Sequence, residues 1–416
     1  MALQATSTLK KMMADYFQKP TSSSERQPVA YCTSTGPAEI LWAMGYYVFF
    51  PENHGAAIGA KKQGSRYIAA AARDGISQDV CSYTTCDLGA QSLGTSPLQE
   101  AYGVLPPVPD VLVYNNQQCL EVQHWFEELG RRFNRPVFGI QSPQLLHEVS
   151  DSTLDYQVIQ LRQLVGWLEK SSGRRLDPSA LKETVKISAD TAVRWGRVLR
   201  LGAHRPSPWT FFDQVIHMFP VVVMRGISAA SAYYAQLEEE LLARVEAKTP
   251  GVPGEQWRVY WDGMPMWFAL RTLSEFFARQ RVTVVASTYC NTWAFEDLDP
   301  ANPLRSIAKA ETSLFINRSS DVKMGMMTEL MKTYQVDGFI LHNSKTCWRN
   351  SNGHYGMKAL LEQVSGLPGL IVEGDVSDER LWSKEQILTK FEAFMEIMEA
   401  RTTTRRLVSG GEPVHV

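Results

Sequence analysis

Short apolar runs alternate with amphipathic stretches over residues 28–150 of the chain. The apolar runs are rich in β-branched and aromatic residues, which is typical of buried strands. They are Val29–Cys32, Tyr46–Phe50, Asp110–Tyr114 and Pro136–Ile140. The stretches between them place apolar residues three and four positions apart, which predicts helices such as Leu120–Arg132. Strands that alternate with helices in this way predict a parallel sheet covered by helices.

The pattern changes over residues 151–250, where helical periodicity continues without a strand. It predicts three long helices, Leu154–Lys170, Pro178–Leu201 and Ile227–Glu246. The segment Thr249–Gly254, which has two prolines and two glycines, then ends the helical pattern. Strands and helices alternate again over residues 251–401. The strands predicted there are Arg258–Trp261, Val282–Ala286, Gly338–Leu341 and Leu370–Val372.

These elements together predict an α/β chain with two open parallel-sheet domains of the Rossmann or flavodoxin kind. We expect an N-terminal helical arm over residues 1–27, a first α/β domain over 28–150 and a helical segment over 151–250. A second α/β domain is expected over 251–401 and a flexible tail over 402–416. Ligands of such sheets bind beyond the carboxyl ends of the strands, so we expect a cleft there.

Composition excludes several classes of function. The 416 residues include 42 Lys plus Arg and 44 Asp plus Glu, which gives a net charge of −2. This balance removes the electrostatic reason to expect a nucleic-acid partner. The longest apolar run, Met218–Met224, is too short to span a bilayer, so no membrane partner is expected. The N-terminus has no signal-peptide pattern, and a cytoplasmic location is therefore expected.

Familiar catalytic motifs are absent from the sequence. Gly59–Ser65 has the glycine spacing of a phosphate loop, but Ser65 stands where the lysine is required, so ATP binding by that loop is not expected. The sequence has no G-x-S-x-G, no H-E-x-x-H and no C-x-x-C motif. The chemistry must therefore come from other residues.

The positions of the cysteines favour a metal centre. Cys32 closes a predicted strand, Cys119, Cys290 and Cys347 follow predicted strands, and Cys81 begins a predicted turn. Thiols at strand ends face the expected cleft, and an iron–sulfur cluster takes its thiolates from separate loops. Spacing alone leaves open the alternative that these are structural thiols in loops or in the core.

Seven sequence motifs occur in a fixed order between residue 31 and residue 380. They are YCTSTGPAEI (31–40), FPENHGAA (50–57), DVCSYTTCDLG (79–89), PDVLVYNNQQC (109–119), RPSPW (205–209), VDGFILHNSKTCW (336–348) and LIVEGDVSDER (370–380). With these motifs the chain resembles the larger, α-type subunit of the (R)-2-hydroxyacyl-CoA dehydratase family, which also contains the benzoyl-CoA reductase subunits.

The resemblance implies one 4Fe–4S cluster that is held by three cysteines and keeps its fourth iron position open. The cysteine motifs of the family fall on Cys81, Cys119 and Cys347, which are the expected ligands. Cys32 is a further candidate, either as a substitute ligand or as a thiol near the cluster. The remaining two cysteines are expected to be core or loop residues.

The resemblance also implies a radical dehydration of a 2-hydroxyacyl-CoA. One electron added to the thioester carbonyl makes a ketyl radical anion, which expels the α-hydroxyl and acidifies the β-hydrogen. After the proton is lost, the electron is returned and reused. An open iron site suits this reaction because iron can act as a Lewis acid toward the thioester oxygen and also deliver the electron.

A hydroxyl and a carboxylate line the substrate pocket of such dehydratases, and the matching positions are Ser34 and Glu52. Local structure offers alternatives, which are a helix N-cap for Ser34 and a first-turn helix carboxylate for Glu52. His54 is either a proton donor or a hydrogen-bonded loop residue.

The resemblance implies partners as well. The chain would form a heterodimer with a smaller related subunit that carries a second cluster, and an ATP-dependent iron–sulfur activator would supply the first electron. Two alternatives remain, which are a benzoyl-CoA reductase-type subunit acting on an aromatic acyl-CoA and a cluster electron carrier without an acyl-CoA substrate. The pair Ser34 and Glu52 favours the dehydratase.

Overall fold

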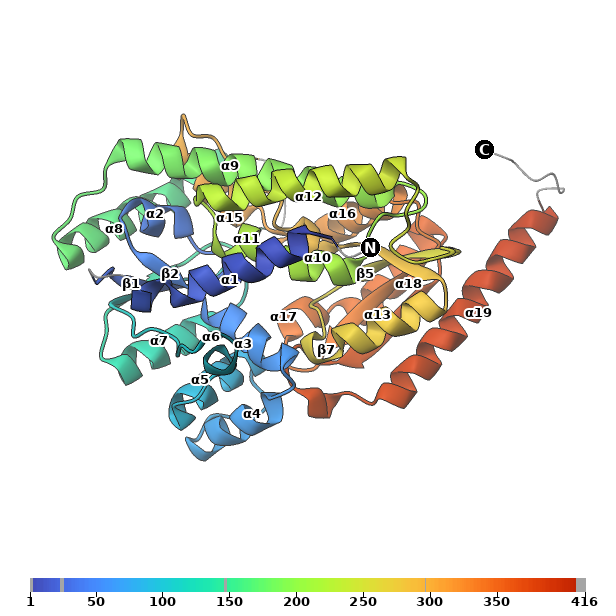
Figure 1. Cartoon of the computed structure of the whole chain (residues 1–416), viewed down its shortest axis with the longest axis horizontal. Coiled ribbons are helices and arrows are strands. Elements are labelled where there is room, and N and C mark those ends of the chain that lie inside the picture. The colour runs from blue at the N-terminus through green and yellow to red at the C-terminus, as the bar shows by residue number, and fades with distance from the viewer. Residues whose placement is uncertain (1–2, 23–25, 146–147, 296, 409–416) are drawn as a thin grey trace.

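Two four-stranded sheets form the two halves of the computed structural model, which describes residues 3–22, 26–145, 148–295 and 297–408 (Figure 1). All strand pairs in both sheets are parallel. The first sheet has the order β2-β1-β3-β4, with strands Val29–Cys32 (β1), Tyr47–Phe49 (β2), Val111–Asn115 (β3) and Val137–Ile140 (β4). The second has the order β6-β5-β7-β8, with strands Trp257–Asp262 (β5), Val282–Ser287 (β6), Gly338–Ser344 (β7) and Gly369–Gly374 (β8).

The two sheets repeat one topology, because β5 to β8 occupy the same order in the second half as β1 to β4 in the first. This is the beginning of the flavodoxin-type order, in which the second strand lies at one edge and the first lies inside. The predicted fold class, with two open parallel-sheet domains, is confirmed. Strands β1, β3 and β6 are buried along their whole length, which explains their nearly continuous apolar sequences.

Helices cover both sheets. Those of the first half are α2 (Ala38–Ala43), α3 (Pro51–Ala60), α4 (Gly64–Arg73), α5 (Ser82–Leu93), α6 (Pro97–Tyr102) and α7 (Glu121–Phe133). Those of the second half are α13 (Leu270–Arg279), α14 (Thr288–Asn291), α15 (Pro303–Thr312), α16 (Ser320–Thr333), α17 (Trp348–Ser351), α18 (His354–Ser365) and α19 (Lys384–Val408).

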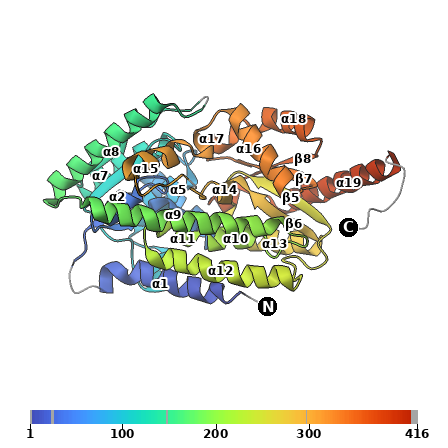
Figure 2. The same ribbon diagram turned by 90° about the horizontal axis from the view of Figure 1, so that it is seen from above.

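The helical segment between the sheets contains the three long helices that the sequence predicted. They are α8 (Asp151–Ser172), α9 (Pro178–Arg200) and α12 (Ser228–Glu246). The short helices α10 (Phe211–His217) and α11 (Phe219–Val223) lie between α9 and α12 in sequence, and the apolar run of residues 218–224 is buried there. Helices α9 and α12 run side by side (Figure 2). No helix of the described residues combines the length and the apolar character needed to cross a bilayer.

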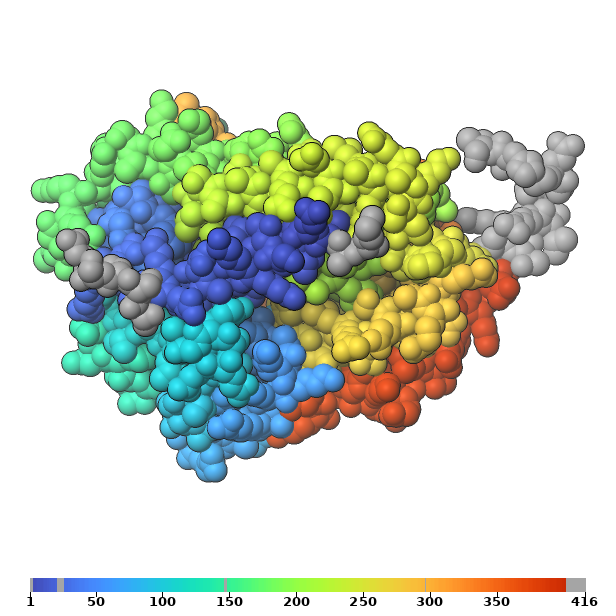
Figure 3. Space-filling view, in the orientation of Figure 1, coloured from blue at the N-terminus to red at the C-terminus, as the bar shows by residue number. Residues whose placement is uncertain are grey.

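The N-terminal helix α1 (Ala5–Ser22) packs on the body of the protein. Figure 3 shows it lying along α12 on the surface. Its own residues Leu9, Tyr16 and Phe17 are buried against the body of the protein. The Tyr16 hydroxyl donates a hydrogen bond to the carbonyl of Val48 in β2. The expected N-terminal helix is therefore present, and its apolar side joins the core of the first half.

Two segments differ from the sequence prediction. Helix α19 continues to Val408, although a flexible tail was predicted from Thr402, and residues 409–416 of that tail lie outside the described residues. The three consecutive threonines from Thr402 have low helix propensity, which favoured a tail in the sequence. The predicted turn at Cys81 is wrong, because Cys81 is the N-cap of the twelve-residue helix α5.

Gly89 explains why α5 contains a glycine in its interior. A Cβ atom at this position would lie 1.9 Å from the carbonyl oxygen of Tyr67 in α4, so the two helices can approach each other only with glycine there. We expect Gly89→Ala to lower the free energy of unfolding by about 1–3 kcal/mol, measured by urea denaturation.

Gly166, an exposed residue within α8, is the matched control for this substitution. A Cβ at Gly166 would have no neighbour within 4 Å. Because alanine is the better helix former, Gly166→Ala should raise the free energy of unfolding by about 0.5–1 kcal/mol. If Gly89→Ala raised the free energy of unfolding as much as Gly166→Ala, helix propensity and not close packing with α4 would decide the effect at Gly89.

Candidate active site

A cavity lies where the two halves face each other, at the carboxyl ends of strands from both sheets. Residues that follow β1, β2 and β3 line it from the first half, and residues that follow β5, β6 and β7 line it from the second. In this order they are Ser34, Glu52, Cys119, Gly263, Tyr289 and Cys347. The cleft that the sequence predicted at the strand ends is therefore present.

Cys81, Cys119 and Cys347 all line this cavity, although they come from three distant parts of the chain. Burial raises the pKa of each thiol, to about 12 for Cys119 and to about 11 for Cys347. The next contribution for Cys81 is repulsion from Cys347 and Cys119, and for Cys119 it is repulsion from Cys347. The three thiols therefore lie along the wall of one cavity.

Each of these cysteines lies at or just before the first turn of a helix. Cys81 is the N-cap of α5, Cys347 is the N-cap of α17, and Cys119 precedes α7 by two residues. Backbone N–H groups of these first turns favour the thiolates and partly oppose the effect of burial. The side-chain amide of Asn350 also donates to the Cys347 sulfur, at 3.6 Å. These donors thus reduce the cost of a negative charge on the sulfurs, although burial still leaves the pKa of each thiol raised.

Hydrogen bonds between the two halves hold the Cys81 and Cys347 loops together. The Ser82 N–H donates to the Thr346 hydroxyl at 3.0 Å, and Thr346 in turn donates to the Asp375 carboxylate at 2.7 Å. The Ser377 N–H donates to the Ser82 hydroxyl at 3.2 Å. All four residues are buried, so water does not compete for these bonds. The neighbours of two predicted ligands are therefore fixed to each other.

A second set of hydrogen bonds joins the Cys119 loop to Glu52 and Ser34. The Gln118 amide and the Ser34 N–H donate to the two carboxylate oxygens of Glu52. The Thr35 hydroxyl donates to Gln118 at 2.5 Å. Burial raises the pKa of Glu52, while the hydrogen bonds from Ser34 and Gln118 and the charge of Arg225 act to lower it.

The structure shows whether Ser34 and Glu52 have the helix-terminal roles that local sequence allows. Ser34 caps no helix, because the N-cap of α2 is Pro37, and its hydroxyl donates to the Asn53 side chain at 3.2 Å. Glu52 does lie in the first turn of α3, but its carboxylate accepts hydrogen bonds from outside that helix. Both residues line the cavity, so their chemistry is available to a ligand.

His54 is engaged in a buried network and is absent from the cavity wall. Its Nδ1 lies 2.7 Å from Asp87 Oδ1 and its Nε2 lies 2.9 Å from the Ser96 hydroxyl. The three residues resemble a Ser-His-Asp triad, but each is at most 3% exposed, and the Ser96 hydroxyl caps α6 by accepting from the Leu98 N–H. Without access for a substrate the arrangement has the geometry of a structural network.

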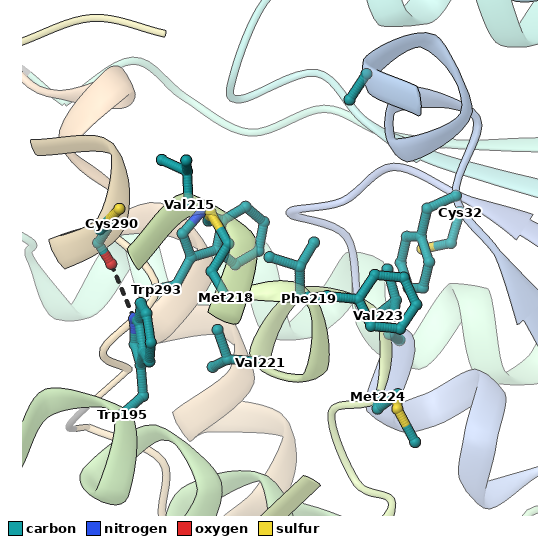
Figure 4. Packing of buried hydrophobic residues seen from close by; sticks show 14 of the residues in the cluster. Cys32, Trp195, Val215, Met218, Phe219, Val221, Val223, Met224, Cys290 and Trp293 are labelled. Carbon is teal, nitrogen blue, oxygen red and sulfur yellow. Dashed lines mark hydrogen bonds between the residues drawn. The ribbon is translucent and has the colours of Figure 1, made fainter. Parts of the chain in front are cut away.

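The other three cysteines, Cys32, Cys86 and Cys290, are fully buried among apolar side chains and do not line the cavity. Figure 4 shows Cys290 beside Trp195, whose indole N–H donates to the Cys290 carbonyl, and Cys32 on the far side of the same cluster. Cys32 ends β1 with its side chain in the core, so the structure does not bring it together with the three cavity cysteines.

Sequence reasoning did not single out the other polar and aromatic residues of the wall. Asp262, at the end of β5, accepts hydrogen bonds from Thr288 at 2.5 Å and from His354 at 3.0 Å. Trp125 and Trp293 provide large apolar surface. The signal for Thr346 and Asp375 was present, because both lie in motifs of the seven stretches. The contact of Thr346 with Ser82, however, joins residues that are far apart in sequence.

Thiols from separate loops that line one cavity are the ligands that an iron–sulfur cluster takes. In the part of the chain that the structure describes, no group of three His, Cys, Asp or Glu side chains is arranged to hold one metal ion. In a cluster each thiolate binds a different iron, so the sulfurs lie farther apart than they would around one ion. Thr84 Oγ1 and Arg349 Nε, both on cavity-lining residues, are buried without a hydrogen-bond partner and could donate to cluster sulfides.

A buried carboxyl near the Ser34 turn gives the protein a testable pH dependence. Glu311 accepts from Asn115 at 2.9 Å and from Gln157 at 3.4 Å, and burial together with the nearby Glu39 raises its pKa from 4.5 to about 8. Between these values the folded chain keeps a proton that the unfolded chain loses. The free energy of unfolding therefore falls as the pH rises through this window.

Glu311→Gln has no carboxyl to ionise, so its free energy of unfolding should not fall in this pH window for that reason. We therefore expect the variant to become more stable relative to the unmodified protein as the pH rises. Thermal unfolding near pH 5 and near pH 8.5 measures the difference. The variant should be about 2–4 °C more stable at the higher pH, and the difference should shrink at the lower pH. A difference that is the same at both pH values would contradict a neutral Glu311.

Known proteins with similar sequences include several acyl-CoA dehydratase subunits. The family model described as "2-hydroxyglutaryl-CoA dehydratase, D-component" matches residues 33–398. The α subunit of (R)-2-hydroxyisocaproyl-CoA dehydratase from Clostridioides difficile is 28% identical over 97% of this chain and 98% of its own length. The α subunit of (R)-phenyllactyl-CoA dehydratase from Clostridium sporogenes is 26% identical over 90% of each chain. A subunit of benzoyl-CoA reductase from Thauera aromatica is 26% identical over 96% of each.

These matches place the chain in the class of acyl-CoA dehydratase subunits. Dehydratases are lyases. The chain belongs to the 2-hydroxyglutaryl-CoA dehydratase D-component family. The family and the enzyme class that the sequence motifs predicted are confirmed. The dehydratases among these relatives are named as α subunits, which are parts of larger assemblies.

Proposed function

We propose that the chain is the cluster-bearing α subunit of an (R)-2-hydroxyacyl-CoA dehydratase. The observation that carries the proposal is the meeting of Cys81, Cys119 and Cys347 in one cavity that Ser34 and Glu52 also line. Similarity to dehydratase α subunits over nearly the whole chain supports it. Three thiolates are enough to hold a 4Fe–4S cluster with one iron open to a substrate.

The chemistry of the proposed reaction requires help at the thioester, because the β-hydrogen that must leave is not acidic. When bound, the cluster would supply one electron and a Lewis-acidic iron to the thioester carbonyl, from which the ketyl radical of the substrate forms. The residues of the chain then have separate tasks, which are to orient the thioester, to exclude water and to move protons.

Glu52 is placed to move a proton within the cavity. Its raised pKa brings the protonated and ionised forms closer in free energy, which suits a group that alternates between them. The Ser34 and Gln118 hydrogen bonds fix both of its oxygens. The aromatic walls, which include Trp125, Tyr289 and Trp293, exclude water and give an apolar surface to the acyl group.

A smaller related subunit with its own cluster and an ATP-dependent iron–sulfur activator complete the proposed system. The subunit names of the relatives support a partner. The activator is proposed because this chain lacks the lysine of a phosphate loop and the reaction needs an electron at low potential. The location proposed for the assembly is the cytoplasm.

A second candidate function is the reduction of an aromatic acyl-CoA. Its support is the similarity to the benzoyl-CoA reductase subunit of Thauera aromatica, which is as high as that to the phenyllactyl-CoA dehydratase subunit. Product analysis separates the two. A dehydratase releases water from a 2-hydroxyacyl-CoA without net reduction, whereas the reductase adds two electrons to a ring.

The test of the proposal begins with iron and sulfide analysis of the chain purified without oxygen, alone and with its partner. EPR spectra are then recorded before and after addition of a 2-hydroxyacyl-CoA. We expect a cluster whose spectrum changes with the acyl-CoA. An unchanged spectrum would contradict the proposal that the chain acts on an acyl-CoA and would favour the alternative of a cluster electron carrier.

A further inference from the structure

Arg225 lies outside the cavity wall but contacts the turn that carries Ser34. It follows α11 in the helical segment and is only 3% exposed. Its Nη1 donates to the Ser34 carbonyl at 2.8 Å, and its Nη2 donates to the Gly36 carbonyl at 2.7 Å. The guanidinium thus holds both ends of this three-residue turn from behind.

The guanidinium is itself held from two sides. Its Nε donates to Glu39 in α2 at 3.1 Å, and the Ser188 hydroxyl in α9 donates to the same carboxylate oxygen at 3.0 Å. The Arg225 guanidinium also lies 5.8 Å from the ring centre of Trp293 and 5.5 Å from that of Phe295. Trp293 is part of the cavity wall. Arg225 therefore joins the helical segment, the first sheet domain and the second half at one point.

The turn that Arg225 holds connects the proposed proton-handling group to the end of the first strand. The Ser34 N–H donates to Glu52, and the Thr35 hydroxyl donates to Gln118, which also contacts Glu52. A shift of this turn would move the carboxylate and its donors together. Misplacement of a reacting group by about 1 Å can cost a hundredfold in rate.

We propose that Arg225 is a positioning residue that fixes the Ser34 turn, and through it the Glu52 carboxylate, in the geometry needed for turnover. The proposal rests on the proposed function, since it gives Glu52 a role in catalysis. Arg225 does not line the cavity, so it should act on the rate of the reaction more than on binding of the acyl-CoA.

Arg258 is a matched control for a merely structural role. Like Arg225, it is a buried arginine that pairs with a glutamate, Glu255, and donates to backbone carbonyls, which are those of Gly202, His204 and Tyr334. It does not line the cavity that holds the cysteines. Loss of either arginine should therefore lower the unfolding temperature, but only Arg225 should affect Glu52.

The test compares Arg225→Gln, Arg225→Lys and Arg258→Gln in the assembled complex with its activator. We expect Arg225→Gln to keep its bound iron and its KM while kcat falls about a hundredfold. Arg258→Gln should keep kcat in the folded fraction. Lysine offers one nitrogen for three acceptors, so Arg225→Lys should recover only part of the rate. Full recovery by lysine, or equal kcat losses in Arg225→Gln and Arg258→Gln, would overturn the proposal.

Hydrogen exchange tests the same inference without turnover. Arg225→Gln should speed exchange of the Ser34 and Gly36 amides while the amides of β3 stay protected, and Arg258→Gln should leave the turn unchanged. Unchanged exchange at the turn in Arg225→Gln would overturn the positioning role even in a complex that dehydrates no substrate. An inactive unmodified complex whose variant shows the faster exchange would instead count against the proposed function alone.

Discussion

Cys119→Ala should leave the chain folded but nearly without bound iron. Cys81→Ala and Cys347→Ala should have the same effect, because the proposed cluster has only three protein ligands. Groups that merely orient a ligand cost about 10–100-fold in metal affinity when they are removed, so loss of a ligand thiolate should cost at least as much. Iron and sulfide per chain, measured on protein reconstituted without oxygen, give the result directly.

Cys290→Ala is the control for these three variants. Cys290 is as buried as a residue can be and packs in the apolar core, so its loss should leave the iron content unchanged (Figure 4). If one of the three cavity variants kept the iron of the unmodified protein, that residue would leave the ligand set. Loss of iron in Cys290→Ala, with an unchanged unfolding temperature, would count against the cavity as the cluster site.

The sequence predicted the sheets well because parallel strands that are buried on both faces leave a strong apolar signal. Strand β1, for example, has the bounds that its apolar run predicted. The signal was weak for α5, where Thr84, Thr85 and Gly89 are poor helix formers. That helix is stabilised by close packing on α4, which is a tertiary effect that local propensity does not contain.

The candidate site was only partly predictable from the sequence. Cys32 and Cys119 lie at or just beyond the end of a predicted strand, yet Cys32 ends β1 with its side chain in the core, whereas Cys119 lies beyond β3 and lines the cavity. Periodicity does not decide between these outcomes. The contacts of Ser82 with Thr346 and of Arg225 with Ser34 depend on how the halves and the helical segment pack, and no local pattern encodes them.

Glu52→Gln should keep the cluster and lose most of the turnover. The amide has nearly the shape of the carboxylate, and its one oxygen can still accept from the Ser34 N–H, although its NH₂ cannot accept from Gln118. The amide also cannot take up a proton at the active-site pH. General acid–base catalysis typically contributes 10²–10⁴-fold, so we expect kcat to fall by roughly that factor. Iron content and dehydration rate, measured on the same preparation of the assembled complex, separate loss of chemistry from loss of cofactor.

Two comparisons make the Glu52 result specific. Ser34→Ala keeps the backbone N–H that donates to Glu52 and removes only a hydroxyl bonded to Asn53, so its cost should be near the 1 kcal/mol or so of one hydrogen bond, about a fivefold loss of rate. Glu121 also lines the cavity and lies beside Cys119, so Glu121→Gln tests whether any cavity carboxylate would serve. Because only Glu52 accepts from both the Ser34 turn and the Cys119 loop, its variant should lose far more activity than Glu121→Gln. Equal losses would assign the effect to the charge of the cavity, and an active Glu52→Gln would leave Glu52 with the helix-terminal role that its place in the first turn of α3 allows.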